Sequence, residues 1–222
     1  MSEDRSLRIE LDGGSVSALL SNPARPHAFL VLAHGAGAGM THAFLAAVAG
    51  GLAERNVAAL RYQFPYMERG SRRPDPSKIA GATVRAACDA AQRLLPGVPL
   101  FAGGKSFGGR MTSQAQAASP LPGVRGLVFL GFPLHPPGRP SDERGRHLFE
   151  VQVPMLFLQG SRDEFASLSL LQPLIDRLAP LATLELIDGA DHSFHLPART
   201  GRKDDEVRRA WLDALVRWVG NL

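Results

Sequence analysis

The sequence has almost no cysteine, because Cys88 is the only one among 222 residues. A lone cysteine excludes an internal disulfide and a thiolate metal site. It falls on an apolar helical stripe with Val84, Ala91 and Leu95, so we expect it to belong to the core. No metal ion and no cofactor are predicted.

Long apolar runs and a secretion signal are also missing. No window approaches the 18 consecutive apolar residues of a membrane-spanning helix, which predicts no membrane partner. Residues 1–6 carry mixed charge and lead directly into a strand-like segment, without the apolar stretch of a secretory leader. We therefore expect a cytoplasmic protein.

The charge pattern gives little sign of nucleic-acid binding. The chain has 25 Lys and Arg against 21 Asp and Glu, a net charge of +4. Its basic clusters at 69–73 and 139–146 lie in loops, interrupted by Pro, Gly and acidic residues, and lack interleaved aromatic residues. We expect a solvated surface and no nucleic-acid partner. The sequence leaves open whether the chain forms a homo-oligomer.

What the sequence does contain is an alternation of strands and helices. The length suits a single domain over residues 1–222. Short alternating strands are predicted at 7–11 and 16–20, and apolar runs typical of buried parallel strands follow at 28–33, 99–102, 126–130 and 153–158. Two further strands are predicted at 57–61 and 183–187. The pattern predicts a three-layer α/β/α sandwich with a mostly parallel, doubly wound sheet.

Helices are expected between these strands. We predict that Thr41 and Ser77 cap two of them, that others span 107–118 and 204–219, and that Pro173 lies in the first turn of a helix or kinks it. The polar, proline-rich segment Pro133 to His147 is long enough for a flap or short lid, so little or no cap is predicted. Ligands of such sheets bind outside the carboxyl ends of the strands.

Ser106 lies at one of these carboxyl ends, between a buried strand and a helix. Gly104 and Gly108 allow the chain to pass closely through the sharp turn of a nucleophile elbow. A phosphate-binding loop would also end in Gly-Lys-Ser, but it needs glycine at position 99, which is Pro99. The spacing therefore favours acyl transfer over phosphate binding.

The glycine-rich loop from His34 to Met40 suggests a dinucleotide site at first sight. Its glycines fail the Gly-x-Gly-x-x-Gly pattern in both registers, because Met40 and His42 stand where the third glycine is needed. Small residues there allow backbone N–H groups to approach a ligand. We interpret the loop as a source of an oxyanion donor, with a simple tight turn as the alternative.

Asp163 and His192 follow later strands, so the chain order is Ser, Asp, His. A serine needs an imidazole to accept its proton, and the imidazole needs a carboxylate to orient it. Other residues also fit these roles: Glu164, Asp188 and Asp191 are alternative carboxylates, and His195 is an alternative base. The position of His192 directly after the last strand's turn favours it over His195.

The segment Gly-Lys-Ser-Phe-Gly-Gly-Arg at 104–110 and this residue order resemble the α/β-hydrolase superfamily over nearly the whole chain. More narrowly, the chain is similar to small uncapped bacterial members related to the dienelactone-hydrolase branch, although that branch proper uses a cysteine nucleophile. The resemblance implies that Ser106 is the nucleophile, Asp163 the acid and His192 the base. It implies oxyanion donors at Phe107 and at Ala36 or Gly37.

These observations predict a serine hydrolase that cleaves a small ester or thioester, with a small-molecule acyl substrate as its partner. The alternative is a non-catalytic binding or scaffold protein on the same fold. We expect His34 to anchor its loop and Lys105 to pair with a carboxylate. Five further residues are expected either to line the acyl pocket or to belong to the core: Met40, Phe64, Tyr66, His135 and Phe194.

Overall fold

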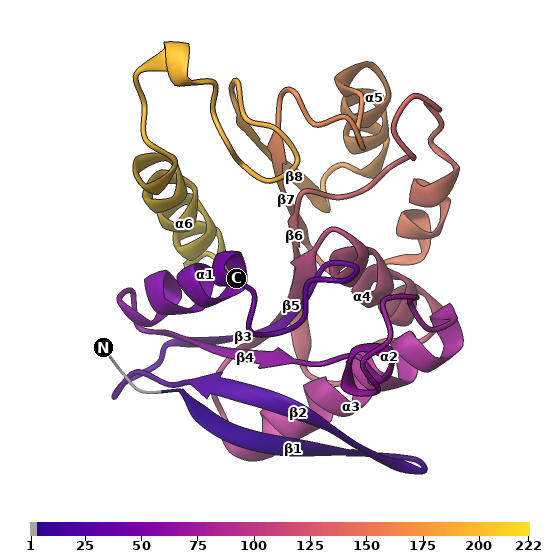
Figure 1. Cartoon of the computed structure of the whole chain (residues 1–222), viewed down its shortest axis with the longest axis vertical. Coiled ribbons are helices and arrows are strands. Elements are labelled where there is room, and N and C mark those ends of the chain that lie inside the picture. Colours follow the sequence, from indigo (N-terminus) through magenta and orange to yellow (C-terminus); the bar gives the residue numbers. More distant parts are fainter. Residues whose placement is uncertain (1–3) are drawn as a thin grey trace.

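The computed structural model describes residues 4–222, so the first three residues of the predicted domain lie outside the described residues. Within 4–222 one eight-stranded sheet runs in the order β1-β2-β4-β3-β5-β6-β7-β8 (Figure 1). Its strands are β1 (Arg5–Leu11), β2 (Gly14–Ser21), β3 (Ala28–Ala33), β4 (Val57–Tyr62), β5 (Leu100–Lys105), β6 (Val124–Leu130), β7 (Met155–Gly160) and β8 (Ala182–Ile187). Only the pairs made by β2 are antiparallel. This confirms the predicted mostly parallel sheet.

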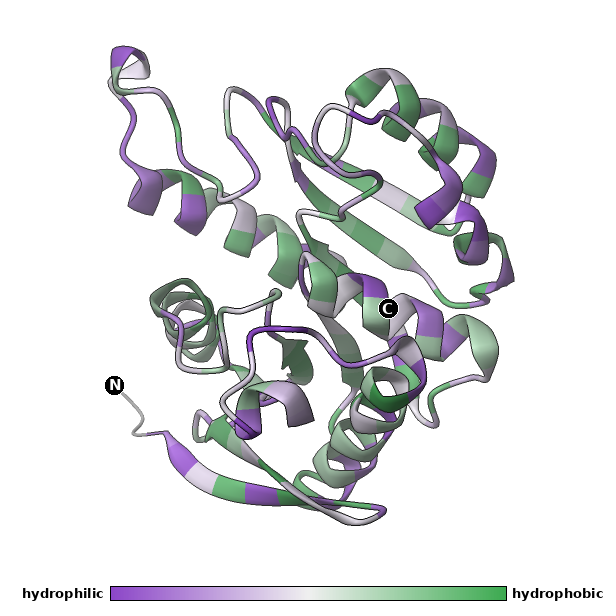
Figure 2. Cartoon of the chain, turned by 45° about the vertical axis from the view of Figure 1, so that its right-hand side comes forward, coloured by the Kyte–Doolittle hydropathy of each residue, from purple (hydrophilic) through white to green (hydrophobic). Residues whose placement is uncertain are grey.

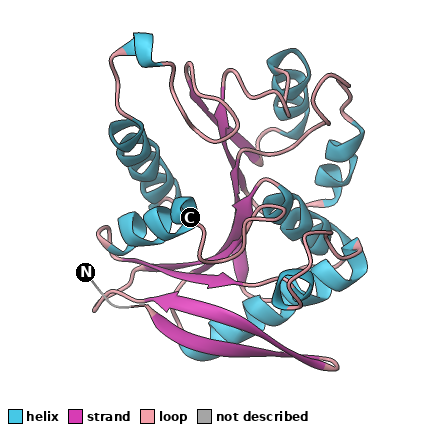
Figure 3. Ribbon diagram, viewed as in Figure 1, coloured by secondary structure: helices cyan, strands magenta, loops and turns pink. Residues whose placement is uncertain are grey.

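Helices cover both faces of this sheet. The helices are α1 (Ala43–Ala53), α2 (Pro65–Glu68), α3 (Ser77–Leu94), α4 (Phe107–Ala118), α5 (Leu168–Leu178) and α6 (Asp204–Gly220), with short 3-10 helices η1 (Glu143–Glu150) and η2 (Ala198–Thr200). In Figures 1 and 3, α1 and α6 lie on one side of the sheet and α3, α4 and α5 on the other. Two buried hydrophobic clusters, one on each face, hold the three layers together.

Burial explains why the central strands read as continuous apolar runs. Every residue of β3, β4 and β7 is buried, whereas β1 at the edge alternates in exposure. Figure 2 shows this contrast as nearly uniform green central strands and a β1 that alternates between purple and green. The aromatic ring of Trp211 in α6 and the side chain of Leu52 in α1 are buried on one face of the sheet.

Two predicted helix caps are wrong. His42, not Thr41, precedes α1, and its ring accepts a hydrogen bond from the N–H of Phe44 at 3.2 Å. Ser77 is the first residue inside α3, because the extended backbone of Pro76 (φ −54°, ψ 151°) occupies the capping position. Capping depends on which residue leaves helical dihedral angles, and composition does not fix that within one residue.

The first part of the segment between β6 and β7 is packed against the protein and does not form a free flap. Phe132, Leu134 and His135 are buried, and the N–H of His135 donates to the carbonyl oxygen of Phe165 at 2.9 Å. Residues 136–142 form a loop that is exposed at 137–140, and η1, which follows it, packs against α4. The segment therefore forms part of the rim of the sheet and no cap domain. None of the helices within 4–222 is long and apolar enough to cross a membrane.

Candidate active site

Ser106 occupies a strained turn between β5 and α4. Its φ of 49° and ψ of −114° lie in a region that residues with a side chain seldom adopt. The turn passes very close to β3: a Cβ on Gly104 would lie 2.4 Å from the carbonyl oxygen of Ala33, and one on Gly108 would lie 2.6 Å from it. Only glycine fits at these two positions, which explains their spacing around the serine.

The structure brings Ser106, His192 and Asp163 into one hydrogen-bonded relay. Ser106 Oγ lies 2.8 Å from His192 Nε2, and His192 Nδ1 lies 2.6 Å from Asp163 Oδ2. When Nδ1 carries the proton and donates it to the carboxylate, Nε2 is free to accept from the serine hydroxyl. The Asp163 side chain is fully buried and that of His192 is 17% exposed, so the serine end of the relay faces solvent.

The carboxylate of Asp163 is held by two further donors. Gln159 Nε2 donates to Oδ2 at 2.5 Å, and the N–H of Phe165 donates to Oδ1 at 2.8 Å. Gln159 is itself fixed, since its Oε1 accepts from the N–H of Phe132 at 2.8 Å. Sequence reasoning missed Gln159, although a glutamine inside the apolar strand β7 was a visible signal.

The alternative carboxylates have other partners. Asp188 accepts from the hydroxyl of Ser161 at 3.1 Å, and Asp191 accepts from the N–H groups of Ser193 and His195. Glu164 is exposed and makes no described hydrogen bond within residues 4–222. Asp163 is thus the described carboxylate that contacts His192.

The alternative base, His195, lies outside the relay. Its Nδ1 is 2.6 Å from Asp204 Oδ2 at the first turn of α6, and its side chain is 66% exposed. The hydrogen bond to Asp204 raises the pKa of His195, and the charges of Asp204 and Asp191 add to that shift. This pair links the loop after β8 to α6.

Among residues 4–222, Lys105 has no salt bridge to a carboxylate, contrary to the prediction. Its Nζ donates to the backbone carbonyl oxygen of His192 at 2.6 Å and lies 5.5 Å from the ring centre of Phe194. Burial lowers the pKa of Lys105 to about 8, and the charges of Asp163 and Asp191 oppose that shift. Lys105 therefore ties the serine elbow to the histidine loop.

Two aromatic side chains pack around the loop that carries His192. Phe194, predicted as pocket or core, is 4% exposed and packs with its ring centre 5.4 Å from that of Trp211. Its φ of 65° is strained for a residue of this size, which the surrounding packing maintains. Phe165, which sequence reasoning missed, places its ring 4.3 Å from the ring of His192.

The loop from His34 to Met40 lies beside the elbow. A Cβ on Gly35 would be 4.0 Å from the Cβ of Ser106. His34 anchors the loop as predicted: it is buried, its Nδ1 donates to the carbonyl oxygen of Gly35 at 2.7 Å, and its Nε2 accepts from the N–H of Phe64 at 3.1 Å. Burial lowers the pKa of His34, which suits a neutral ring with this tautomer.

The loop N–H groups differ in their availability. The N–H of Gly37 donates to the hydroxyl of Tyr66 at 3.1 Å, so this proposed donor already has a partner. The N–H groups of Ala36 and Phe107 have no acceptor among residues 4–222. Met40 donates its N–H to Gln63 Oε1 at 2.8 Å and is half-buried.

Three of the residues predicted to belong to the pocket or the core are buried. Phe64 and Tyr66 are fully buried and pack with His34 and Phe107. His135 is also buried, and its Nε2 accepts from the N–H of Ser167 at 2.8 Å. These side chains support the loops around the site, because their rings fill the space beneath those loops.

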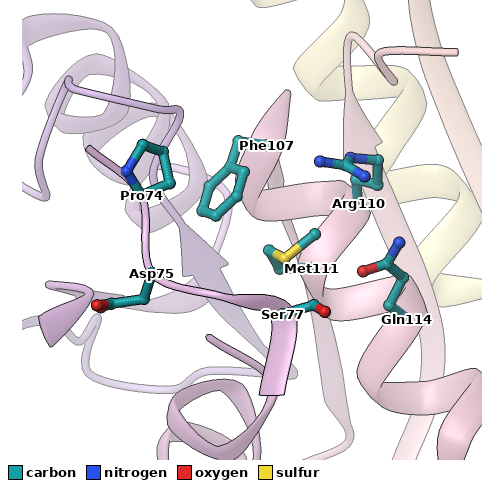
Figure 4. Close-up of a pocket in the computed structure, with 7 residues that line it drawn as sticks. All are labelled: Pro74, Asp75, Ser77, Phe107, Arg110, Met111 and Gln114. Carbon is teal, nitrogen blue, oxygen red and sulfur yellow. The ribbon is translucent and has the colours of Figure 1, made fainter. Parts of the chain in front are cut away.

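A cavity of about 360 Å³ lies beside the first two turns of α4 (Figure 4). It is lined by Pro74, Asp75, Ser77, Phe107, Arg110, Met111 and Gln114. Figure 4 shows the four α4 side chains facing the segment 74–77 across this space. One of its lining residues, Phe107, directly follows Ser106 in the sequence. Within residues 4–222 no group of three or more His, Cys, Asp or Glu side chains is placed to hold a metal ion.

The fold is shared with solved α/β hydrolases. An α/β serine hydrolase without a lid from Xanthomonas campestris is 21% identical, with a TM-score of 0.76 over 98% of this chain and 96% of that chain. A dienelactone hydrolase from Anabaena variabilis is 19% identical, with a TM-score of 0.78 over 99% and 97%. The esterase domain of a Rhodothermus marinus protein is 15% identical, with a TM-score of 0.72 over 97% of each chain.

These likenesses define the class of fold, an α/β hydrolase without a large cap. Residues 26–220 match the family described as the alpha/beta hydrolase domain. The chain therefore belongs to the α/β-hydrolase family, which confirms the resemblance drawn from the elbow and the residue order.

Proposed function

We propose that this protein is a serine hydrolase that cleaves a small ester or thioester through an acyl-enzyme on Ser106. The observation that carries the proposal is the continuous relay from Ser106 Oγ to His192 Nε2 at 2.8 Å and from His192 Nδ1 to Asp163 Oδ2 at 2.6 Å. Nucleophile, base and orienting carboxylate are within hydrogen-bond reach of one another, which is the geometry that acyl transfer requires.

In the acylation step, Ser106 Oγ attacks the substrate carbonyl carbon while His192 Nε2 takes the hydroxyl proton. Asp163 stabilises the resulting imidazolium and holds its tautomer. The tetrahedral intermediate then collapses: the bond to the alcohol or thiol leaving group breaks, and His192 returns its proton to that group. Ser106 is left as an ester with the acyl group.

In the deacylation step, water takes the place of the leaving group. His192 accepts a proton from the water as its oxygen attacks the acyl carbon, and it gives that proton to Ser106 Oγ when the acyl bond breaks. The carboxylic acid leaves, and the relay returns to its starting state.

The negative charge on the carbonyl oxygen needs donors, for which Phe107 and Ala36 are the best candidates. Their N–H groups have no acceptor within residues 4–222, whereas that of Gly37 is occupied by Tyr66. Phe107 is the first residue of α4, so the positive end of that helix adds to the stabilisation. The N–H of Phe107 belongs to the elbow itself, and that of Ala36 belongs to the loop beside it.

The substrate size follows from the neighbouring cavity. About 360 Å³ beside α4 is near the lower limit for small-molecule sites, which suits an ester or thioester of modest size. The solved neighbours include proteins described as a serine hydrolase and an esterase domain, in keeping with this reaction class. A scaffold protein on this fold would need neither a strained serine nor a complete relay.

Labelling with a fluorophosphonate probe tests the proposal directly. Wild type should gain one adduct by intact mass and Ser106→Ala none, because only an activated serine attacks the phosphorus. Ser119→Ala, at the exposed end of the same helix α4, is the matched control and should label like wild type. Absence of an adduct on folded wild type would favour the scaffold function.

A further inference from the structure

The cavity beside α4 is lined by a positively charged side chain, that of Arg110, which has no role in the proposed reaction. Arg110 lies one helical turn after Ser106, and its N–H donates to the carbonyl oxygen of Ser106 at 3.1 Å. Four residues along a helix correspond to about 6 Å of axial rise, and side chains lean toward the helix N-terminus. Helix geometry therefore places the side chain of Arg110 on the same helix face as the serine, and Arg110 lines the cavity (Figure 4).

The guanidinium of Arg110 has no partner among residues 4–222. No described hydrogen bond or salt bridge involves it, and its Nε is a buried donor without an acceptor. An arginine stays charged at all ordinary pH values, so leaving it half-buried and unpaired is unfavourable. Such a group in a native protein binds water, an ion or a ligand, and the guanidinium of Arg110 is therefore available to an anion in the cavity.

One further cation, Arg144, and a neutral histidine, His147, lie near Arg110. Arg144 in η1 makes no described salt bridge within residues 4–222, and burial together with the charge of Arg144 lowers the pKa of Arg110. Burial and the charge of Arg110 lower the pKa of His147 to about 4, so its ring is neutral at pH 7. Its Nε2 lies 2.7 Å from Ser113 Oγ on α4.

One carboxylate faces the same cavity but is already engaged. Asp75 Oδ1 accepts from Arg69 Nη2 at 2.6 Å, and Oδ2 accepts from the N–H of Tyr66 at 2.7 Å. Both oxygens therefore have cationic or N–H partners of their own. Asp75 leaves Arg110 uncompensated, and its charge disfavours a doubly charged ligand such as phosphate more than a singly charged one.

We propose that Arg110 forms a subsite for a carboxylate of the substrate, so that the natural ester or thioester carries an ionised carboxylate several ångströms from its reactive carbonyl. Phe107 and Met111 line the cavity together with Arg110 and pack the short carbon chain between the two groups. The arginine fork matches a carboxylate and holds it in a fixed orientation. The inference rests on the proposed serine hydrolase reaction and names its substrate class.

Matched pairs of substrates test the subsite. Monomethyl glutarate is compared with methyl hexanoate, and the acetate ester of 4-hydroxybutanoate with pentyl acetate, so that each pair differs by the charged group on the acyl or the alcohol side. The variants are Arg110→Gln and Arg144→Gln, with Arg125→Gln, an exposed residue near the start of β6, as control. Chromatography of the released acid gives kcat/KM for each combination.

For one of the two pairs, wild type and Arg125→Gln should prefer the charged ester. Arg110→Gln should reduce that preference about tenfold to a hundredfold, and Arg144→Gln should reduce it less. Because the preference is a ratio, a general loss of activity cancels. Free glutarate should also slow fluorophosphonate labelling of wild type and lose this effect in Arg110→Gln. If Arg110→Gln folds poorly, the Arg144→Gln variant on η1 carries the same comparison.

The outcomes separate the two proposals. If Ser106 is labelled but neither pair shows a preference that depends on Arg110 or Arg144, the carboxylate subsite is wrong and the serine hydrolase stands. If Ser106 is not labelled and no ester is cleaved, the reaction itself is wrong, and the subsite falls with it.

Discussion

The relay and the neighbouring cavity lie side by side but are built differently. In the relay every described polar side chain has partners: Asp163 alone receives hydrogen bonds from His192, Gln159 and the N–H of Phe165. In the cavity Arg110 has none within residues 4–222. Hydrogen bonds within the protein thus hold the groups that would carry out the chemistry, whereas the guanidinium of Arg110, which would bind the substrate, is available to an anionic ligand. Preorganisation belongs to the first region and recognition to the second.

The largest expected effect comes from breaking the relay at its buried end. Asp163→Asn replaces the carboxylate with a neutral amide. The amide N–H can donate to Nδ1 of His192 and so favour the wrong tautomer, and the amide has no negative charge to stabilise the imidazolium. We expect kcat to fall about 10⁴-fold, with the fold retained. Hydrolysis of a neutral ester, followed together with thermal unfolding, measures this.

Asp188→Asn is the matched control for Asp163→Asn. Asp188 follows the neighbouring strand β8, but its carboxylate contacts Ser161 and not the relay. It should retain nearly full activity. Equal losses in the two variants would show that Asp163 has no special role.

Much of this site was accessible from the sequence, because its chemistry follows strand ends. The apolar runs of β5 and β7 and the Gly-Lys-Ser-Phe-Gly elbow predicted where Ser106 and Asp163 lie in the sheet. Parallel strands bring their carboxyl ends to one edge, so separation in the chain did not matter.

What the sequence did not predict depends on three-dimensional contacts. The roles of His135 and Phe194 as buried anchors follow from the elements packed against them, and no periodicity in the chain encodes those neighbours. The cavity is lined by α4 and the segment 74–77, which meet only after folding. The hydrogen bond from Lys105 to His192 links residues that are distant in the chain.

The second prediction concerns the packing that holds the elbow in place. Gly108→Ala would put a Cβ 2.6 Å from the carbonyl oxygens of both Ala33 and His34, so β3 and α4 must separate. We expect a loss of about 3 kcal/mol in the free energy of unfolding, together with most of the activity. Urea unfolding and ester hydrolysis measure the two effects.

Gly50→Ala in α1 is the matched control, because it replaces a glycine that has no close neighbour. It shows whether the loss in Gly108→Ala comes from the close packing at position 108. No atom lies within 4 Å of a Cβ built on Gly50. Alanine favours helix, so this variant should gain about 0.5–1 kcal/mol in the free energy of unfolding. A tolerated Gly108→Ala would mean that the elbow is less tightly packed than the structure indicates.

The smallest expected effect lies at the link between elbow and histidine loop. Lys105→Met removes the donor to the carbonyl oxygen of His192 while keeping a long apolar stem. We expect kcat to fall about tenfold with KM little changed, since a charge-assisted hydrogen bond contributes about 1.5–3 kcal/mol and part of it is lost to relaxation of the loop. Lys78→Met, on the exposed start of α3, should have no such effect.

The pH dependence distinguishes this positioning role from a simple loss of packing. The pKa of Lys105 is about 8 in the folded chain against an ordinary value of 10.5. Between these values the unfolded chain binds more protons, so the free energy of unfolding of wild type should rise with pH relative to Lys105→Met, by up to about 1.4 kcal/mol per pH unit. Over the same range the wild-type kcat should decline as the ammonium becomes a weaker neutral donor, and the variant should show no such decline. Parallel pH profiles for the two proteins would show that the Lys105 amine does not position His192.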